Sequence, residues 1–454
     1  MIKYIISLLT LITSLNCFGQ IDKWKEYEKS LTNIEFEKLI QPKKYNLDSN
    51  NFLYEINKWR DNESITGKII FEKIINWNKY PKPKKTGVIC KYMVKLDSTA
   101  MDVNYTPPFY VYIPKNYSHN KPTKLLIHYK GGWLSRKEFP KDVDKEIVND
   151  NPTFSYLDKY NIIQIFPALK SDLAIYGWYG YEHLRKMILQ TKKLFNIDDN
   201  QVYLSGFSDG GRTVYSSSYL IPTVFAGFYP INGTINTSRV NFPNFTSRDI
   251  LAHIAGKDAV VYFQYPISIA EKANEWNINW TIKLLPEKEH FYHTYEKEIL
   301  PIIFNHIENT TRKPFPNRII NHRNYDYPEF KNIDWIQYKV NTERKPEKWH
   351  HTSQAIISIK ETETDTFEYG IKTGQINAKY FNNTFEIKTS LVDEVEIYIS
   401  PLMVNIELPV KIIINGKIIF NKKISYSKDF LIEQFENNFD RKQVWINKIS
   451  LKVE

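Results

Sequence analysis

The chain has 454 residues, 42% of them hydrophobic and 25% charged, a composition that predicts a globular protein and excludes a fibrous one. This length is too great for one small core, so we expect two or more domains. The formal net charge is +10, but the lysines are spread along the chain without a basic cluster or a nucleic-acid motif, so we expect no nucleic-acid partner.

Residues 1–19 have the pattern of a secretory signal peptide: a lysine near the start, a mostly apolar run, and small residues before the cleavage point. The apolar run is too short to span a membrane, so we expect an exported protein, periplasmic or secreted. A lipid anchor on Cys17 is the less favoured alternative, because residues 14–16 make a poor lipobox. Removal of the signal leaves Cys90 alone, which excludes an internal disulfide.

Residues 20–85 are predicted to form a helical N-terminal segment. Their apolar residues recur at helical spacing, as in Phe52, Ile56 and Trp59. The Pro-Lys-Pro-Lys stretch at 81–84 ends the pattern.

Residues 86–312 alternate between strand-like and helix-like segments. Strands are expected at 88–94, 109–113, 125–128, 162–166, 202–204, 226–230, 251–255 and 281–285, and helices at 181–195, 212–220, 263–276 and 296–306. This alternation predicts an α/β fold with a doubly wound, mostly parallel sheet covered by helices. Sheets of this type carry their chemistry at the carboxyl ends of the strands.

The stretch VYLSGFSDGGRTVYSS at 202–217 contains a G-x-S-x-G pattern centred on Ser208. A short apolar run precedes the motif and a helix-compatible run follows it, the context that a nucleophile elbow requires. Gly206 and Gly210 would allow the strand and the helix to approach closely. We therefore predict that Ser208 is a catalytic nucleophile.

A serine nucleophile needs a base and an acid, and in this topology they follow the serine in the order Asp then His. Asp258 comes directly after the strand at 251–255, and His290 comes after the strand at 281–285. His293 is an alternative base on the same loop, and His290 is favoured because it is closer to the strand end. The predicted relay is Ser208, Asp258 and His290, and its chemistry uses no metal and no cofactor.

The oxyanion hole requires backbone N–H groups that point at the developing charge. One is expected from Asp209, directly after the nucleophile. Another is expected from Gly131 or Gly132, in the loop after the strand at 125–128. His128 is interpreted as a structural residue at the strand end.

Residues 313–454 are predicted to form a separate β-rich, sandwich-like domain. From Pro314 onward the helical pattern stops and strand-like runs follow, such as 395–399 and 410–414. Asn415-Gly416 is a strong hairpin signal between two of them.

Residues 86–310 resemble an α/β-hydrolase, similar to the bacterial esterase group that includes polyhydroxybutyrate-depolymerase-like and feruloyl-esterase-like proteins. The stretches that carry the resemblance are LLIHYKGGW, VYLSGFSDGG, HIAGKDAVV and LLPEKEHFYH. In that group they imply the oxyanion loop, the nucleophile, the acid and the base. Two departures stand out: Tyr129-Lys130 separates the histidine from the glycines, and Glu287-Lys288-Glu289 replaces the usual Gly-x-Gly before the base.

The function predicted from these residues is hydrolysis of a small-molecule or glycan-linked carboxylic ester. A serine peptidase of the prolyl-oligopeptidase type is the first alternative, although residues 20–85 are too short and too helical for its β-propeller. The second is a non-catalytic glycan-binding protein on a hydrolase fold, with Trp335, Trp349 and Tyr369 as candidate stacking residues. The sequence does not specify an oligomeric state.

Overall fold

The computed structural model describes residues 40–41, 50–96, 105–144, 153–175, 177–235, 241–262, 264–274, 278, 280–324, 332–360, 363–369 and 372–454. The predicted signal peptide at 1–19 lies outside these residues, as does most of the predicted helical stretch before residue 50.

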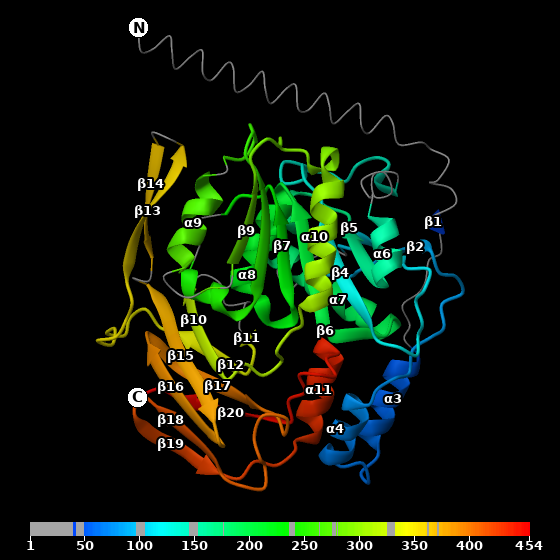
Figure 1. The fold of residues 1–454 in the computed structure, drawn as a ribbon. Helices are drawn as coiled ribbons and strands as arrows, with labels where there is room; N and C mark the ends of the chain where they lie inside the picture. Colours follow the sequence, from blue (N-terminus) through cyan, green and yellow to red (C-terminus); the bar gives the residue numbers. More distant parts are fainter. Residues whose placement is uncertain are drawn as a thin grey trace.

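A sheet of nine strands forms the centre of the first domain in the described part of the chain (Figure 1). Its strands, in spatial order, are β1 (Ile40–Gln41), β2 (Val88–Met93), β3 (Pro108–Ile113), β5 (Ile162–Pro167), β4 (Thr123–Tyr129), β6 (Ile197–Phe207), β7 (Gly227–Ile231), β8 (Asp249–Ala255) and β9 (Trp280–Leu285). The β2–β3 and β3–β5 pairs are antiparallel, and the other pairs are parallel. This is the strand order of the α/β-hydrolase fold, so the predicted fold class is confirmed.

Helices cover both faces of this sheet because its central strands are apolar on both sides. Leu125 and Ile127 point to the face that packs against α7 (Trp178–Leu194), α8 (Asp209–Leu220) and α9 (Gln264–Asn274). Leu126, between them, points to the face that packs against α6 (Phe154–Tyr160) and α10 (Glu296–Asn309). Because successive side chains along a strand point to opposite faces, both faces of the sheet are apolar and both are covered by helices.

Most predicted elements lie within a few residues of those observed. The exception among the strands is β6, which begins at Ile197, five residues before the predicted start. Asp198, Asp199 and Asn200 have low strand propensity, and the pairing with β4 is irregular there: Thr123 pairs with Ile197 and Leu125 with Val202, so the residues between them form a bulge. Helix α6 was not predicted because seven residues are too few for a clear periodic signal.

The C-terminal domain contains two sheets that enclose one apolar core. The first is β10 (Arg318–Asn324), β15 (Thr373–Phe381), β16 (Thr384–Ser390), β18 (Val410–Ile414) and β19 (Lys417–Lys422). The second is β11 (Asn332–Ile333), β12 (Ile336–Val340), β17 (Val392–Ile399) and β20 (Asn447–Lys452). Asn415 and Gly416, both with positive φ, form the turn between β18 and β19.

One helix in this domain contradicts the expectation that helical structure ends at Pro314. Helix α11 spans Lys428–Asn438, and the Ser427 side chain caps it by accepting a hydrogen bond from the N–H of Phe430. The apolar face of α11 consists chiefly of Leu431, Ile432 and Phe435. So few residues show little helical periodicity beside the strand-like runs on either side, and this helix was therefore not predicted.

Helix α11 packs against the two N-terminal helices, α3 (Asn50–Asp61) and α4 (Gly67–Ile75), and Figure 1 shows the three together. Phe435 stacks on Trp59 with ring centroids 6.2 Å apart, and it contacts Phe52 edge-on at 5.5 Å. The N-terminal helices therefore share the core of the C-terminal domain.

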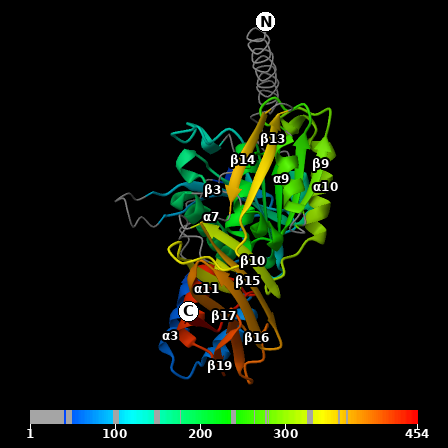
Figure 2. The same cartoon turned by 90° about the vertical axis from the view of Figure 1, so that its left-hand side faces the viewer.

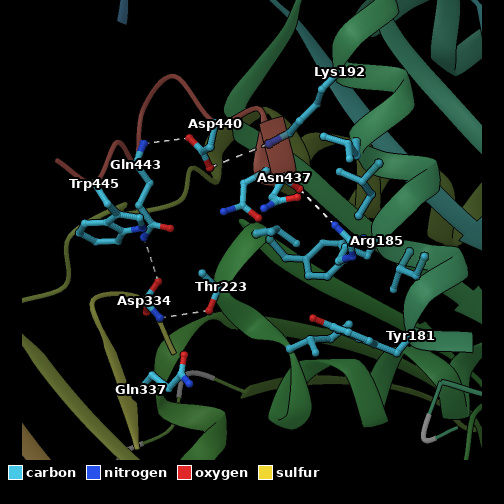
Figure 3. Close-up of a pocket in the computed structure, with 17 residues that line it drawn as sticks. Tyr181, Arg185, Lys192, Thr223, Asp334, Gln337, Asn437, Asp440, Gln443 and Trp445 are labelled. Atoms are coloured by element: carbon cyan, nitrogen blue, oxygen red, sulfur yellow. Dashed lines mark hydrogen bonds and ion pairs between the residues drawn. The ribbon is translucent and has the colours of Figure 1, made fainter. Parts of the chain in front are cut away.

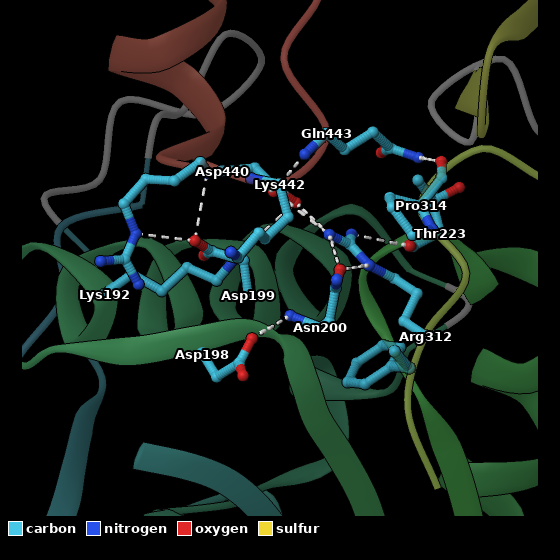
Figure 4. Close-up of polar contacts among 12 residues, drawn as sticks. Lys192, Asp198, Asp199, Asn200, Thr223, Arg312, Pro314, Asp440, Lys442 and Gln443 are labelled. Carbon is cyan, nitrogen blue, oxygen red and sulfur yellow. Dashed lines mark hydrogen bonds and ion pairs between the residues drawn. The ribbon is translucent and has the colours of Figure 1, made fainter. Parts of the chain in front are cut away.

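A buried ionic network joins the two domains at the amino end of β6 (Figure 4). Asp199 of β6 pairs with Lys192 of α7 at 2.9 Å and with Arg441 at 2.9 Å. Asp440 pairs with Arg312 at 2.8 Å. Burial alone would raise the pKa of Asp440, but the charges of Arg312 and Lys192 hold it below its usual value. Each buried charge thus has an opposite partner, as a stable interface requires.

A hairpin of β13 (Ser353–Lys360) and β14 (Glu363–Tyr369) extends from the C-terminal domain alongside α9 (Figures 1 and 2). No helix within the described ranges is long and apolar enough to cross a membrane.

Candidate active site

Ser208 occupies a sharp turn between β6 and α8. Its backbone has φ 55° and ψ −115°, a conformation that non-glycine residues rarely adopt. A Cβ on Gly206 would lie 2.5 Å from the backbone of Gly210, and a Cβ on Gly210 would lie 1.9 Å from the carbonyl oxygen of Tyr129. Neither glycine can be replaced without displacing backbone, so the motif forms the predicted elbow and holds the Ser208 hydroxyl at its apex.

His290 connects this serine to the predicted acid. Its Nε2 lies 2.9 Å from Ser208 Oγ, and its Nδ1 lies 2.7 Å from Asp258 Oδ2. Since a carboxylate only accepts, Nδ1 carries the proton of the neutral ring, and Nε2 accepts from the Ser208 hydroxyl. The histidine side chain is 4% exposed and that of Asp258 is 1%, so little water competes for these bonds.

The loop after β8 is built to hold the carboxylate of Asp258. The second oxygen, Oδ1, accepts hydrogen bonds from the backbone N–H groups of Val260 and Val261 at 2.7 and 2.8 Å. Both oxygens of the Asp258 carboxylate therefore accept from N–H groups. The two backbone N–H groups hold the carboxylate in its orientation toward His290.

His293, the alternative base, has a different environment. It belongs to a short 3₁₀ turn at Tyr292–Thr294, and its ring packs against Tyr292 at 4.0 Å and Phe207 at 5.9 Å. Burial, together with the charge of the nearby His128, lowers its pKa to about 3. His293 is therefore neutral and a weak base at neutral pH, and the ring that bonds to the serine is that of His290.

The loop after β4 lies directly against the nucleophile. A Cβ on Gly131 would lie 2.9 Å from Ser208 Cβ, and Gly132 has a φ of +69°. Asp209 begins α8, so its N–H has no acceptor within the helix. The Asp209 carboxylate accepts from the N–H groups of Trp133 and Leu134 at 2.9 and 3.0 Å, and thereby ties the loop to the helix. Gly131 and Asp209 thus lie beside Ser208, and Gly132 follows Gly131 in the same loop.

His128 is a half-buried residue of β4. Its Nδ1 is 2.8 Å from Ser205 Oγ, and burial lowers its pKa to about 4. This contact joins β4 to β6, which agrees with the structural interpretation of His128.

Asn232, directly after β7, supports the relay and was not identified from the sequence. Its Nδ2 donates to the carbonyl oxygen of His290 at 2.5 Å and to the Tyr295 hydroxyl at 2.7 Å, and its Oδ1 accepts from the N–H of Ala255 at 2.9 Å. The side chain is buried, and its φ of +45° is one that asparagine tolerates better than most residues. The available signal was an Asn-Gly pair after a strand of the same sheet.

Trp335, a candidate for stacking on a sugar, is in fact a core residue. Its side chain is fully buried, its ring packs edge-on against Phe385 at 5.2 Å, and its Nε1 donates to the Pro316 carbonyl at 2.7 Å. It has no face available to a glycan, so this expectation is wrong. The side chain of Tyr369 lies outside the described positions.

No protein-family model matches the chain. A segment of 128 residues is 30% identical to the bifunctional acetylxylan esterase/xylanase XynS20E of Neocallimastix patriciarum, and it covers 27% of this chain and only 17% of that protein. Similar solved structures include a thermostable esterase, with 16% identity and a TM-score of 0.40 over 49% of this chain and 63% of the other. They also include a ferulic acid esterase, with 13% identity and a TM-score of 0.38 over 48% and 98% of the two chains. The matched segment is similar to part of an esterase, in agreement with the predicted resemblance.

Proposed function

We propose that the protein is an exported serine esterase that cleaves carboxylic esters with Ser208 as nucleophile, His290 as general base and Asp258 as the acid that orients the base. The observation that carries the proposal is the bonded chain from Ser208 Oγ through both ring nitrogens of His290 to the Asp258 carboxylate, at 2.9 and 2.7 Å. A serine hydroxyl becomes an effective nucleophile when a base in this position accepts its proton.

In the first half of the reaction, Ser208 Oγ forms a bond to the ester carbonyl carbon while its proton passes to His290 Nε2. The negative charge that develops on the carbonyl oxygen is stabilised by the N–H of Asp209 and by N–H groups of the Gly131-Gly132 loop. The bond between the carbon and the alcohol oxygen then breaks, and His290 Nε2 returns the proton to the departing alcohol.

In the second half, water gives a proton to His290 Nε2 and its oxygen bonds to the acyl carbon. The bond to Ser208 Oγ then breaks and the serine recovers its proton from His290. His290 Nδ1 keeps its proton throughout and donates it to the Asp258 carboxylate, which offsets the positive charge of the imidazolium.

We propose a short-chain ester on a small molecule or a glycan as the substrate. The named activity of the partially matching relative, acetylxylan esterase, supports an acetyl group on a polysaccharide. Peptide hydrolysis is the less favoured alternative, because the segment ahead of the sheet, where a prolyl oligopeptidase carries its β-propeller, contains the helices α3 and α4. We therefore expect turnover of acetylated xylan or p-nitrophenyl acetate in preference to prolyl peptides.

The test is reaction of the purified chain with a fluorophosphonate probe, followed by mapping of the labelled peptide. We expect label on Ser208 and loss of ester hydrolysis by at least about 10³-fold in Ser208→Ala. The matched control is Ser218→Ala, whose hydroxyl donates to the Tyr215 carbonyl within α8 at 2.7 Å. Label on another residue would remove Ser208 from the mechanism, and glycan binding without turnover would favour the non-catalytic alternative.

Export is proposed from the signal pattern at 1–19. Amino-terminal sequencing of protein secreted by a bacterial host should find Gln20 first. A protein that begins at an acylated Cys17 would support the lipoprotein alternative, and one that keeps Met1 would contradict export.

A further inference from the structure

A cavity of about 360 Å³ lies between the two domains (Figure 3). Its walls come from α7, the 3₁₀ turn at Pro222–Val224, the β11–β12 turn and the segment after α11. This volume is in the range of small-molecule sites, which often form at domain interfaces. Lys192 lines the cavity and pairs with Asp199 near the amino end of β6, whereas Ser208 follows the carboxyl end. Along the strand, roughly 30 Å separate the two places.

Asp334 is one of the residues that line this cavity, and it carries a buried carboxylate oxygen that the described groups around it leave without a partner. Its side chain is 0% exposed, and its backbone φ of +49° holds it in the turn between β11 and β12. Oδ1 accepts from Arg248 at 2.7 Å and from Gln443 at 3.3 Å, but Oδ2 has no hydrogen-bond partner in the described part of the protein. A buried polar atom left in this state costs about 1–3 kcal/mol, so a ligand donor at Oδ2 would be favourable.

The charges that line the cavity are already compensated. Asp334 is paired with Arg248, and Lys192 with Asp199 at 2.9 Å. Arg185 makes two bonds to Glu182, at 2.8 and 2.9 Å. A charged ligand would lose its hydration without gaining an unpaired countercharge, so the site favours an uncharged one.

The remaining lining combines hydrogen-bonding amides with apolar surface. Gln337, Asn437 and Gln443 each carry a carboxamide, which both donates and accepts. Gln443 Nε2 donates to the Pro314 carbonyl and to Asp334, and Gln337 Oε1 accepts from the Tyr398 hydroxyl, so a ligand would use the Gln337 amino group, the Gln443 carbonyl oxygen and the Asn437 carboxamide. Leu184 and Phe225 contribute apolar surface to the same cavity. A ring with hydroxyl groups at its edge can hydrogen-bond to the carboxamides, and the C–H groups on its faces can pack against the apolar side chains.

We propose that the interdomain cavity binds a neutral polyhydroxylated ring of monosaccharide size, with one ring hydroxyl donating to Asp334 Oδ2. Because the walls come from both domains, the bound ring would contact both and stabilise their association. This site is separate from the proposed relay, and its occupancy does not depend on ester hydrolysis.

The test is calorimetric titration of the full-length Ser208→Ala chain with D-glucose and D-xylose, and with glucosamine and glucuronate as charged analogues. We expect saturable binding of at least one neutral sugar, at least about tenfold tighter than its charged analogue, together with a raised melting temperature. Because the measurement is of binding, a failure of the esterase proposal would leave its outcome unchanged.

Two variants localise the binding to the cavity. Val224→Phe places a larger side chain into the cavity from a partly exposed turn and should abolish binding, while Asn437→Ala changes an exposed lining residue and should weaken it. Leu408→Phe, at a position 54% exposed and not in the lining, is the matched control and should leave binding unchanged. Absence of saturable binding by both neutral sugars, tighter binding of the charged analogues, or binding that survives Val224→Phe would overturn the proposal.

Discussion

Replacing each of the two histidines on the β9–α10 loop separates their roles. In His290→Ala, Ser208 Oγ loses the ring nitrogen at 2.9 Å, and Asp258 loses the donor at 2.7 Å. Loss of the base in such a relay lowers kcat by about 10⁴- to 10⁶-fold, which corresponds to about 5–8 kcal/mol of barrier. The turnover that remains would come from the oxyanion hole and substrate binding.

In His293→Ala, the expected loss is in packing. The ring is buried against Phe207 and Tyr292, and its pKa of about 3 leaves it neutral at the pH of the assay. We expect kcat to fall by at most about tenfold, or about 1.4 kcal/mol of barrier, while the free energy of unfolding falls by about 2 kcal/mol or more for the cavity. Asp258→Asn should lie between the two histidine variants, because it disturbs the tautomer of the base without removing it.

The assay is steady-state hydrolysis of p-nitrophenyl acetate at pH 7.5, with urea denaturation of each variant to show that it is folded. A ranking in which His293→Ala loses more kcat than His290→Ala would refute the assignment of the base. If neither substitution changes kcat, the relay is not catalytic and the binding-protein alternative takes its place.

Three further predictions concern the surroundings of the relay. Gly131→Ala puts a methyl group against the nucleophile and should lower kcat by about 10²-fold. Gly132→Ala has no atom within 4 Å of the new Cβ, but a φ of +69° strains an alanine, so it should lower the free energy of unfolding by about 1–3 kcal/mol and lower kcat less than Gly131→Ala does. Equal effects on kcat in steady-state assays would contradict this geometry. Asn232→Asp replaces the donor to the carbonyl of the relay histidine by an oxygen, so kcat should fall about 10- to 100-fold at an unchanged KM, and a change confined to KM would count against a positioning role. Burial lowers the pKa of His253 in the folded protein to about 4, whereas the unfolded chain has a pKa of about 6.5 at this residue. As the pH falls below about 6.5, the unfolded chain binds this proton before the folded protein does, so the free energy of unfolding falls by about 1.4 kcal/mol per pH unit. Urea denaturation at pH 7 and 5.5 should show a shallower decline in His253→Gln, and an identical decline would refute the assignment.

Local patterns in the chain were enough to select three residues that the structure brings into one hydrogen-bonded chain. Gly206 and Gly210 are required by contacts of 1.9 to 2.5 Å that only a residue without a side chain allows, so the spacing of the motif carries its geometry. Parallel strands bring their carboxyl ends to one edge, so residues that follow successive strands meet there. Ser208, Asp258 and His290 meet in this way.

The supporting contacts depend on residues that are distant in the chain. Asn232 reaches His290 across 58 positions, and the Asp209 carboxylate reaches the N–H of Trp133 across 76. Such contacts produce no periodic pattern in the sequence, because they depend on the direction of single side chains in the folded sheet. The same limit applies to α11, whose short apolar face is stabilised by α3 and α4 from the other end of the chain.

The sequence by itself determined the α/β-hydrolase order of elements, the elbow at Ser208 and the pair of histidines from which the base had to come. Only the tertiary structure distinguished those histidines by position, since His290 Nε2 lies 2.9 Å from Ser208 Oγ, whereas burial lowers the pKa of His293 to about 3. It also decided that Trp335 belongs to the core. The physical reason is the same in both cases: burial and side-chain direction are set by packing between distant segments, whereas strand alternation and turn geometry are set by neighbours in the chain.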